Sequence, residues 1–251
     1  SSAVAREGVA GRDGRGREHE RDFGYIKGLF ALDAHRDGGA KRILLERSLR
    51  FMRFKGKKMA KVGQYTGNFF SPGIDKRYEE ELRFYRENDF EEVDTVEDVA
   101  LDLTAFQVTE YQVQAQRSAR DMGVTIEPYR PEHLEGMRHF VERLNYPEWF
   151  PEGWELDFAS SGGTLVAMMG PEVVGWVNFH PNPEGGDFGP IAVLEELRGK
   201  GIGTCLLLES VLRMKASATP NVTALWANVP FYLKKGWKIS RRYKVLQRRL
   251  D

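Results

Sequence analysis

Seven consecutive residues, Arg198 to Thr204, carry the strongest chemical signal in the sequence. They read Arg-Gly-Lys-Gly-Ile-Gly-Thr and stand between an apolar run and a segment with helical spacing of apolar residues. Three glycines in five residues let backbone N–H groups converge without interference from Cβ atoms. The start of a helix adds unpaired N–H donors and the positive end of the helix dipole. The stretch therefore predicts an anion cradle suited to a pyrophosphate, with Arg198 and Lys200 adding positive charge.

Two common phosphate-binding motifs do not account for this loop. A P-loop requires Gly-x-x-x-x-Gly-Lys followed by Ser or Thr, and that pattern is absent. A dinucleotide fingerprint requires Gly-x-Gly-x-x-Gly, and counting from Gly199 the last position is Thr204. What the residues do match is Arg-x-x-Gly-x-Gly.

Composition bounds the class of protein. The chain has 251 residues, enough for one large domain or two ordinary ones, with 41% hydrophobic and 29% charged residues. Lysine plus arginine and aspartate plus glutamate both number 37, so no global field draws the protein to nucleic acid or to an anionic membrane, and neither partner is expected. No membrane-length apolar run or signal peptide is visible, which predicts a cytoplasmic protein.

The single cysteine, Cys205, excludes a disulfide within the chain and argues against a cysteine-based metal site, so no metal is expected. Its place just after the glycine loop invites a nucleophile interpretation. A small buried hydrophobic side chain on the helix explains it better.

The elements that must position the loop alternate between strands and helices. This mixture predicts an α/β or α+β fold with a central mixed sheet. Helices are expected over residues 40–55, 74–88, 107–122, 132–144, 201–216 and 230–235. Strands are expected over residues 3–6, 23–34, 58–62, 90–105, 124–128, 164–169, 173–180, 188–193, 222–227 and 237–250.

Two segments of the sequence echo each other and predict a tandem duplication. Each runs from Arg-x-x-Gly through an amphipathic helix and a strand to a Phe-Tyr pair and a later aromatic residue. The first copy is marked by Arg36, Gly39, Phe84, Tyr85 and Phe90, and the second by Arg198, Gly201, Phe231, Tyr232 and Trp237. Only 35 residues precede Arg36, so the first unit is expected to be incomplete at its N-terminus.

The loop resembles the pyrophosphate loop of the general N-acetyltransferase (GNAT) superfamily, which binds acetyl-CoA. The stretch from Ile191 to Gly203 is similar to the family's fourth strand and third helix, and Phe231-Tyr232 with Gly236-Trp237 is similar to its late tyrosine motif. The resemblance covers about residues 124–251, and more weakly residues 3–105, as in bacterial tandem GNAT proteins. It implies a degenerate first unit over residues 1–106, a connecting helix over 107–123 and an acetyltransferase domain over 124–251.

The resemblance implies direct attack of an amine on the acetyl-CoA thioester, without a covalent enzyme intermediate. The pantetheine arm is expected between strands 188–193 and 222–228, which splay apart, and Pro190 fits an interrupted pairing. Tyr232 matches the family's general acid, and Asp187 is the first candidate for a general base, ahead of Glu184, His180 or an ordered water. The cofactor site is expected to comprise Ile191, Ala192, Val193, Arg198, Gly199, Lys200, Gly201, Ile202, Gly203, Thr204 and Asn228.

Several alternatives stay open at the level of sequence. A non-catalytic acyl-CoA-binding or sensing module would carry the same loop. The acceptor could be a small molecule or a peptide amine, and the protein a monomer or a homodimer. The aromatic residues Tyr146, Trp149, Phe150 and Trp154 form either part of an acceptor wall or a hydrophobic plug under a loop.

Overall fold

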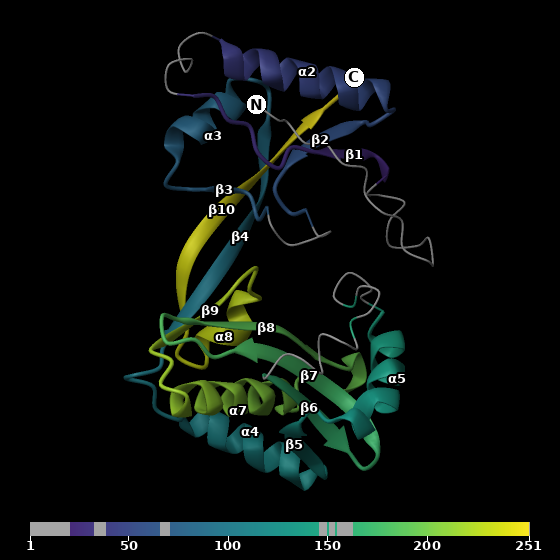
Figure 1. The fold of residues 1–251 in the computed structure, drawn as a ribbon, viewed down its shortest axis with the longest axis vertical. Coiled ribbons are helices and arrows are strands. Elements are labelled where there is room, and N and C mark those ends of the chain that lie inside the picture. The colour runs from purple at the N-terminus through teal and green to yellow at the C-terminus, as the bar shows by residue number, and fades with distance from the viewer. Residues whose placement is uncertain are drawn as a thin grey trace. The chain divides into compact units, whose positions relative to one another are not determined.

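The fold is known from a computed structural model, which describes residues 21–32, 39–65, 71–145, 150, 154 and 163–250. It is a mixed α/β protein, as the sequence predicts. Ten strands are joined in the order β1-β2-β10-β4-β9-β8-β7-β6-β5, and β3 pairs with β10. The β1–β2 and β8–β9 pairs are parallel, so each pair needs a crossover connection between its two strands, and a helix usually provides it. Figure 1 shows the ribbon.

The chain divides into two compact units, one formed by Ser1–Val96 with Arg241–Asp251 and the other by Glu97–Ser240. This grouping follows contacts in space, whereas the domains expected over 1–106, 107–123 and 124–251 are units of sequence. Those domain boundaries therefore stay a prediction.

The first unit contains one sheet region and two helices among its described residues. Its elements are β1 (Phe23–Tyr25), α2 (Ala40–Phe54), β2 (Met59–Val62), β3 (Ile74–Asp75), α3 (Glu79–Arg86), the start of β4 (Glu91–Asp102) and most of β10 (Lys238–Arg249). Leu45, Leu49 and Met52 of α2 form its core together with Leu82 and Tyr85 of α3. The helical periodicity of these apolar residues is the reason that α2 was predictable.

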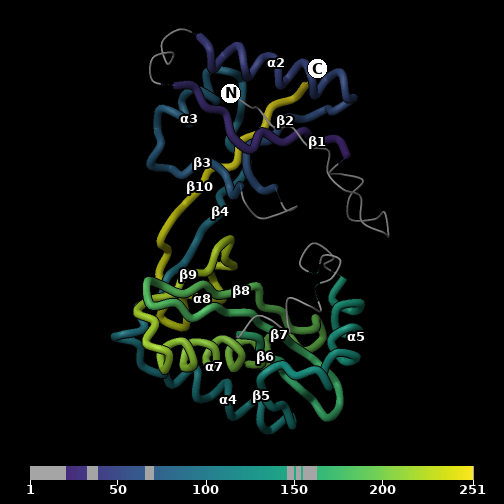
Figure 2. Tube along the Cα trace, viewed as in Figure 1, coloured from purple at the N-terminus to yellow at the C-terminus, as the bar shows by residue number. Residues whose placement is uncertain are grey.

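The second unit holds the glycine loop. Its elements are the end of β4, α4 (Glu110–Asp121), β5 (Val124–Pro128), α5 (Leu134–Leu144), β6 (Thr164–Met169), β7 (Glu172–His180), β8 (Gly186–Val193), α7 (Ile202–Ala216), β9 (Asn221–Ala224), α8 (Val229–Leu233) and the start of β10, with 3-10 turns at Pro131–His133 and Glu195–Leu197. The central strand β7 is buried along most of its length. Helices α4 and α7 lie side by side in Figures 1 and 2.

The two units repeat one another in register. Adding 162, the interval from Gly39 to Gly201, to the bounds of α2 and β2 gives the bounds of α7 and β9. The parallel pairs repeat as well, because Gly24 opposes Ala60 and Gly186 opposes Val222. A Cβ on Gly24 or on Gly186 would approach the sulfur of Met52 or Met214, which are themselves equivalent residues.

After β2 and β9, the number of positions between equivalent residues of the two units falls to 147, which is the separation of Tyr85 and Tyr232. It relates β4 to β10 residue for residue. It also relates Asp89 to Gly236, and both adopt a positive φ, of 60° and 86°. The difference between the two intervals corresponds to extra residues in the first unit, which include β3.

Each unit completes its sheet with the strand that follows the other unit's tyrosine motif. In the second unit, Val99–Asp102 of β4 pair with β9, and in the first unit, Leu246–Arg249 of β10 pair with β2. Both pairs are antiparallel. The strands β4 and β10 therefore each begin in one unit and end in the other.

Two predicted elements are several residues shorter than expected, and those expected over 90–105, 107–122 and 222–227 each lose three residues at one end. The strand expected over 23–34 ends at Tyr25, because its partner β2 is only four residues long. The helix expected over 74–88 begins at Glu79, since Ile74 and Asp75 instead pair with Lys244 and Tyr243. The expected strand over 3–6 and the marker Arg36 lie outside the described residues. Within the described ranges, no helix is both long and apolar enough to cross a membrane.

Candidate functional site

Two glycines shape the backbone that leads into α7. Gly199 and Gly201 adopt φ values of 77° and 93°, which side chains with a Cβ rarely adopt. Gly201 is the N-cap of α7 and also packs closely on α4, because a Cβ there would lie 2.9 Å from the carbonyl oxygen of Ala115. The glycine at 201 is therefore needed twice, for the turn and for the approach of α4.

The N–H groups of residues 199–204 form an open row of donors. No residue in the described part of the chain accepts a hydrogen bond from them, and the first helical bond runs from Cys205 N–H to the Gly201 carbonyl at 3.0 Å. Arg198 donates from Nε to the Val193 carbonyl at 3.2 Å, and Lys200 is exposed beside it. Unpaired donors at a helix start, flanked by two cations, suit a phosphate or pyrophosphate group.

The strands in front of this loop separate. The register of β8 with β9 is formed by Gly186 with Val222 and Asp187 with Thr223, and no further pair follows within the described residues of the two strands. On its other side β8 pairs with β7, with a register shift opposite Gly189 and Pro190. This geometry agrees with the predicted splay and with the predicted interruption at Pro190. It leaves Ile191–Val193 next to the loop with one edge free of β9.

Tyr232 lies on α8, within an aromatic cluster. Its ring makes edge-to-face contacts with Phe188, Phe231 and Trp237, at centroid distances of 6.0, 5.0 and 5.1 Å. The side chain is 5% exposed, and burial raises the pKa of its hydroxyl above the ordinary value. A raised pKa keeps the phenol protonated, which a proton donor requires. No described residue hydrogen-bonds this hydroxyl.

The other predicted polar residues lie apart from this cluster. Asp187 is exposed, and its neighbour Phe188 is the one that packs on Tyr232, so the Asp187 side chain points to the opposite face of β8. His180 pairs with Asp187 across the β7–β8 ladder, and Glu184 lies in the exposed turn between them. Asn228 is exposed and is the N-cap of α8. Of these residues, Asn228 is the nearest to Tyr232 in the sequence, four positions before it.

Cys205 is buried, and burial raises the pKa of its thiol to about 11. A thiol with a raised pKa is a poor nucleophile at neutral pH. This environment agrees with the predicted role of a small hydrophobic side chain.

Lys235 is a buried cation near the loop that sequence reasoning missed. It is 1% exposed, its Nζ donates to the Phe231 carbonyl, and the same atom lies 3.6 Å from the centroid of the Phe231 ring. Burial, with a further effect from Lys234, lowers the pKa of Lys235 to about 8. The internal repeat carries the signal that could have revealed this role of Lys235. The equivalent residue of the first unit, Asn88, donates from its side chain to the Phe84 carbonyl at 2.7 Å. Both side chains cap the same turn.

The same Phe231 ring faces the glycine loop. A Cβ on Gly203 would lie 3.3 Å from Cε2 of Phe231 and 3.6 Å from Cγ2 of Val193. Gly203 therefore sits between the end of β8 and the start of α8, where a larger side chain would have to displace one of them.

In the first unit the equivalent position is filled. Lys41 stands where Gly203 stands in the second unit, and its ammonium lies 4.2 Å from the centroid of the Phe84 ring and forms an ion pair with Glu81. The start of α2 is thus occupied by a side chain of the unit itself.

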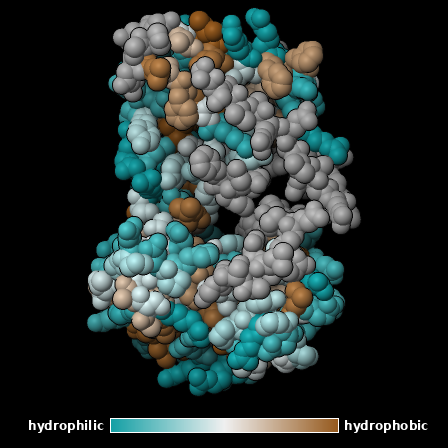
Figure 3. Space-filling view, in the orientation of Figure 1, coloured by the Kyte–Doolittle hydropathy of each residue, from teal (hydrophilic) through white to brown (hydrophobic). Residues whose placement is uncertain are grey.

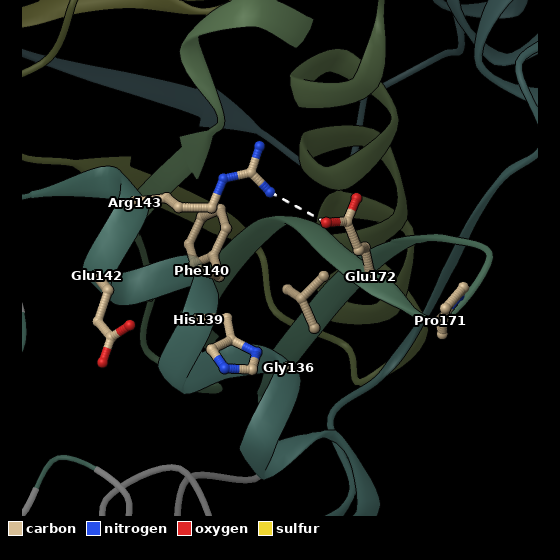
Figure 4. Close-up of a pocket in the computed structure, with 8 residues that line it drawn as sticks. Gly136, His139, Phe140, Glu142, Arg143, Pro171 and Glu172 are labelled. Atoms are coloured by element: carbon tan, nitrogen blue, oxygen red, sulfur yellow. Dashed lines mark hydrogen bonds and ion pairs between the residues drawn. The ribbon is translucent and has the colours of Figure 1, made fainter.

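A separate shallow pocket of about 260 Å³ lies between α5 and the turn from β6 to β7 (Figure 4). Arg143 reaches Glu172 across it, with Nη1 and Oε1 3.2 Å apart, and also pairs with Glu196. Arg143 and Glu172 are thus already paired with each other, and the pocket contains none of the predicted site residues. The pocket is therefore not the candidate active site.

Of the four aromatic residues at 146–154, the structure describes Phe150 and Trp154, while Tyr146 and Trp149 lie outside the described residues. Phe150 and Trp154 are buried, and Phe150 packs on Trp176 with ring centroids 4.7 Å apart. Their burial favours the hydrophobic plug over the acceptor wall.

Comparison with known proteins agrees with this geometry. Residues 128–237 match the model of the Acetyltransferase (GNAT) family, so the chain contains a GNAT acetyltransferase family domain. No curated protein matches the chain.

Solved structures share the fold at low sequence identity. The chain is similar to a GCN5-related glucosamine N-acetyltransferase region of a fungal multi-domain GH3 beta-N-acetylglucosaminidase, with a TM-score of 0.73 and 17% identity over 90% of this chain and 29% of that one. It is similar to a GCN5-related N-acetyltransferase from Sphaerobacter thermophilus, with a TM-score of 0.61 and 15% identity over 91% of this chain and 72% of that one. It is also similar to a tandem GNAT protein from the clavulanic acid biosynthesis pathway, with a TM-score of 0.59 and 15% identity over 92% of this chain and 76% of that one.

Proposed function

We propose that the second unit is an N-acyltransferase that moves an acetyl group from acetyl-CoA to a primary amine. The observation that carries the proposal is the open row of N–H groups at residues 199–204, placed where β8 leaves β9. Such a row fits a pyrophosphate, and the free edge of Ile191–Val193 fits the amides of a pantetheine arm. The family match over residues 128–237 supports the same assignment.

In this proposal acetyl-CoA supplies an activated acyl carbonyl, and the chain's own groups bind, orient and move a proton. Residues 198–204 hold the phosphates, and backbone groups of 191–193, with those after β9, orient the arm. Tyr232 donates its proton to the departing thiolate, because its hydroxyl is protonated and has no competing partner among the described residues. Asp187 remains a proposed general base, and its exposed position near the start of β8 is compatible with relay through water.

A non-catalytic acyl-CoA-binding module is the second candidate. The observation that favours it is the burial of Tyr232 inside an aromatic cluster, which packing alone would explain. A module of this class would bind acetyl-CoA without releasing CoA thiol in the presence of any amine.

The decisive experiment is thiol release from acetyl-CoA against a panel of primary amines, with calorimetric binding of acetyl-CoA measured in parallel. The panel includes glucosamine, since the fungal region with the similar fold is described as acting on it, together with peptides and aminoglycoside-like amines. Amine-dependent thiol release supports the enzyme. Binding without release supports the module, and the absence of both overturns the proposed site.

A further inference from the structure

The outer face of α2 is an exposed surface that the proposed function does not use. It carries three large apolar side chains, Ile43, Phe51 and Phe54, which are 54%, 46% and 84% exposed. Residues 43, 47, 51 and 54 follow one another at helical spacing, so they lie along one stripe of the helix. In Figure 3, hydrophobic residues stand beside hydrophilic ones where α2 lies in Figure 1.

The same face is strongly basic. Arg42, Arg47, Arg50 and Arg53 are exposed, and none of them forms an ion pair with any residue of the described chain. Glu46 is the one acidic residue of α2. On the opposite side of the helix, Leu45, Leu49 and Met52 are buried in the core of the first unit. The helix therefore has an inner apolar face and an outer face that mixes arginine with large apolar groups.

The internal repeat shows that this composition is specific to α2. In the second unit α4 packs along α7, and the α7 residues Thr204, Cys205 and Leu208 are buried. The equivalent residues of α2 are Arg42, Ile43 and Glu46, and they are exposed. Arginine and glutamate at these positions suit water or a charged surface, since an apolar covering helix would leave them buried and unpaired.

We infer that the outer face of α2 docks on an anionic membrane surface. Arginine guanidinium groups pair with lipid phosphates, while phenylalanine rings between them enter the headgroup boundary, as in amphipathic helices that lie in the bilayer plane. Fifteen residues span about 22 Å and include five arginine or lysine residues on the helix, so α2 lies on the bilayer and does not cross it. The balanced charge of the whole chain does not show this, because the basic residues are concentrated locally.

Two other occupants fit the face less well. A second copy of the chain would place arginines against arginines. A nucleic acid would use the arginines but would leave exposed the apolar stripe of Ile43, Phe51 and Phe54, which gains most from an interfacial hydrocarbon boundary. Charge complementarity together with the stripe therefore favours the lipid surface.

The test is co-sedimentation of the full chain with vesicles of phosphatidylcholine, with and without phosphatidylglycerol. We expect binding that requires phosphatidylglycerol and weakens at high salt. Arg47→Glu with Arg50→Glu should lower the partition coefficient at least about tenfold, because each surface arginine is worth about a fivefold change. Phe51→Ser with Phe54→Ser should lower it by a similar factor while leaving the charge unchanged.

The matched control is Arg117→Glu with Arg120→Glu, which makes the same charge change on exposed positions of α4. It should retain vesicle binding. Circular dichroism checks that each variant folds, and the single change Arg47→Gln replaces the Arg47 and Arg50 pair if that pair does not fold. Equal binding to both kinds of vesicle, or loss of binding in the control alone, overturns the inference. So does a preference for duplex DNA over vesicles, or a dimer in sedimentation velocity that only the phenylalanine pair disrupts.

Discussion

Tyr232 and Tyr85 form a matched pair of buried tyrosines, one in each unit. Both pack edge-to-face on a preceding phenylalanine and a following aromatic ring, and burial raises the pKa of both hydroxyls. The proposed acid role separates them, because Tyr232 follows Phe231, whose ring faces Gly203 of the glycine loop, whereas the ring of Phe84 before Tyr85 faces Lys41. The pair therefore offers a control that holds the packing environment constant.

We expect Tyr232→Phe to lower kcat by about 10²–10⁴-fold, as for loss of a general acid, with little change in the acceptor KM. Tyr85→Phe removes the same hydroxyl from an equivalent aromatic setting and should leave turnover unchanged. Thiol-release kinetics measure both. A loss of less than about threefold in Tyr232→Phe would assign this tyrosine to packing.

Lys235 gives a prediction about pH. Burial lowers its pKa to about 8 in the folded chain, whereas the ordinary value is 10.5. Between these values the unfolded chain holds a proton that the folded chain has released. The free energy of unfolding should therefore rise with pH across this window, by up to about 3 kcal/mol from this group.

The variant Lys235→Asn copies Asn88 of the first unit, which keeps a donor to the same carbonyl but does not titrate. Urea unfolding at a series of pH values should show the rise in the wild type and a flatter curve in the variant. Parallel curves for the two proteins would mean that Lys235 is charged and hydrated in the folded state.

At the scale of the elements, the two glycines that begin α2 and α7 can be compared with each other. Gly39 and Gly201 are both left-handed N-caps, but a Cβ on Gly39 would meet nothing within 4 Å, whereas one on Gly201 would lie 2.9 Å from the Ala115 carbonyl. Gly39→Ala should cost about 1 kcal/mol for its backbone conformation alone. Gly201→Ala should cost about 2–4 kcal/mol, because it adds a steric clash. Equal losses in chemical denaturation would contradict this difference.

The loop itself is tested at Gly203. Gly203→Glu places a carboxylate in the proposed phosphate cradle and should weaken acetyl-CoA binding by several kcal/mol, since like charges repel strongly in a partly dry site. Calorimetry measures the affinity, and Gly170→Glu, a change at an exposed turn with nothing within 4 Å of its Cβ, is the control. Unchanged affinity in a folded Gly203→Glu protein would refute the assignment of the loop.

The elements were largely predictable from sequence because their patterns are local. The apolar spacing in α2 and α7 and the turn at Gly123 depend on neighbouring residues. The bounds of α2 and α7 and the end of α4 therefore fall within one residue of expectation, whereas α4 begins three residues later than expected. The short β3 and the late start of α3 were not predictable, since Ile74 and Asp75 find their partners in β10 at the far end of the sequence. In the site, the glycine loop was visible as a motif. The capping role of Lys235 depends on a helix only five residues long, and no spacing pattern marks it.

At the scale of the whole molecule, the units differ in what fills the start of their crossover helix. The second unit has Gly203 there, and the first has Lys41, which is engaged with Glu81 and Phe84. We therefore expect one acetyl-CoA per chain. Lys41→Glu should leave both the stoichiometry and the turnover nearly intact. Calorimetry that finds two sites per chain, with one lost in Lys41→Glu, would show that the first unit is a working cofactor site.

The crossing of β4 and β10 has a consequence for synthesis on the ribosome. The strand that completes the second unit against β9 is translated early, so it is already available when β9 emerges. The strand that completes the first unit against β2 is translated only after the rest of the second unit. The nascent chain must therefore carry β2 with one edge unpaired while the second unit is being made, which makes this edge a point where a chaperone would act or aggregation would begin.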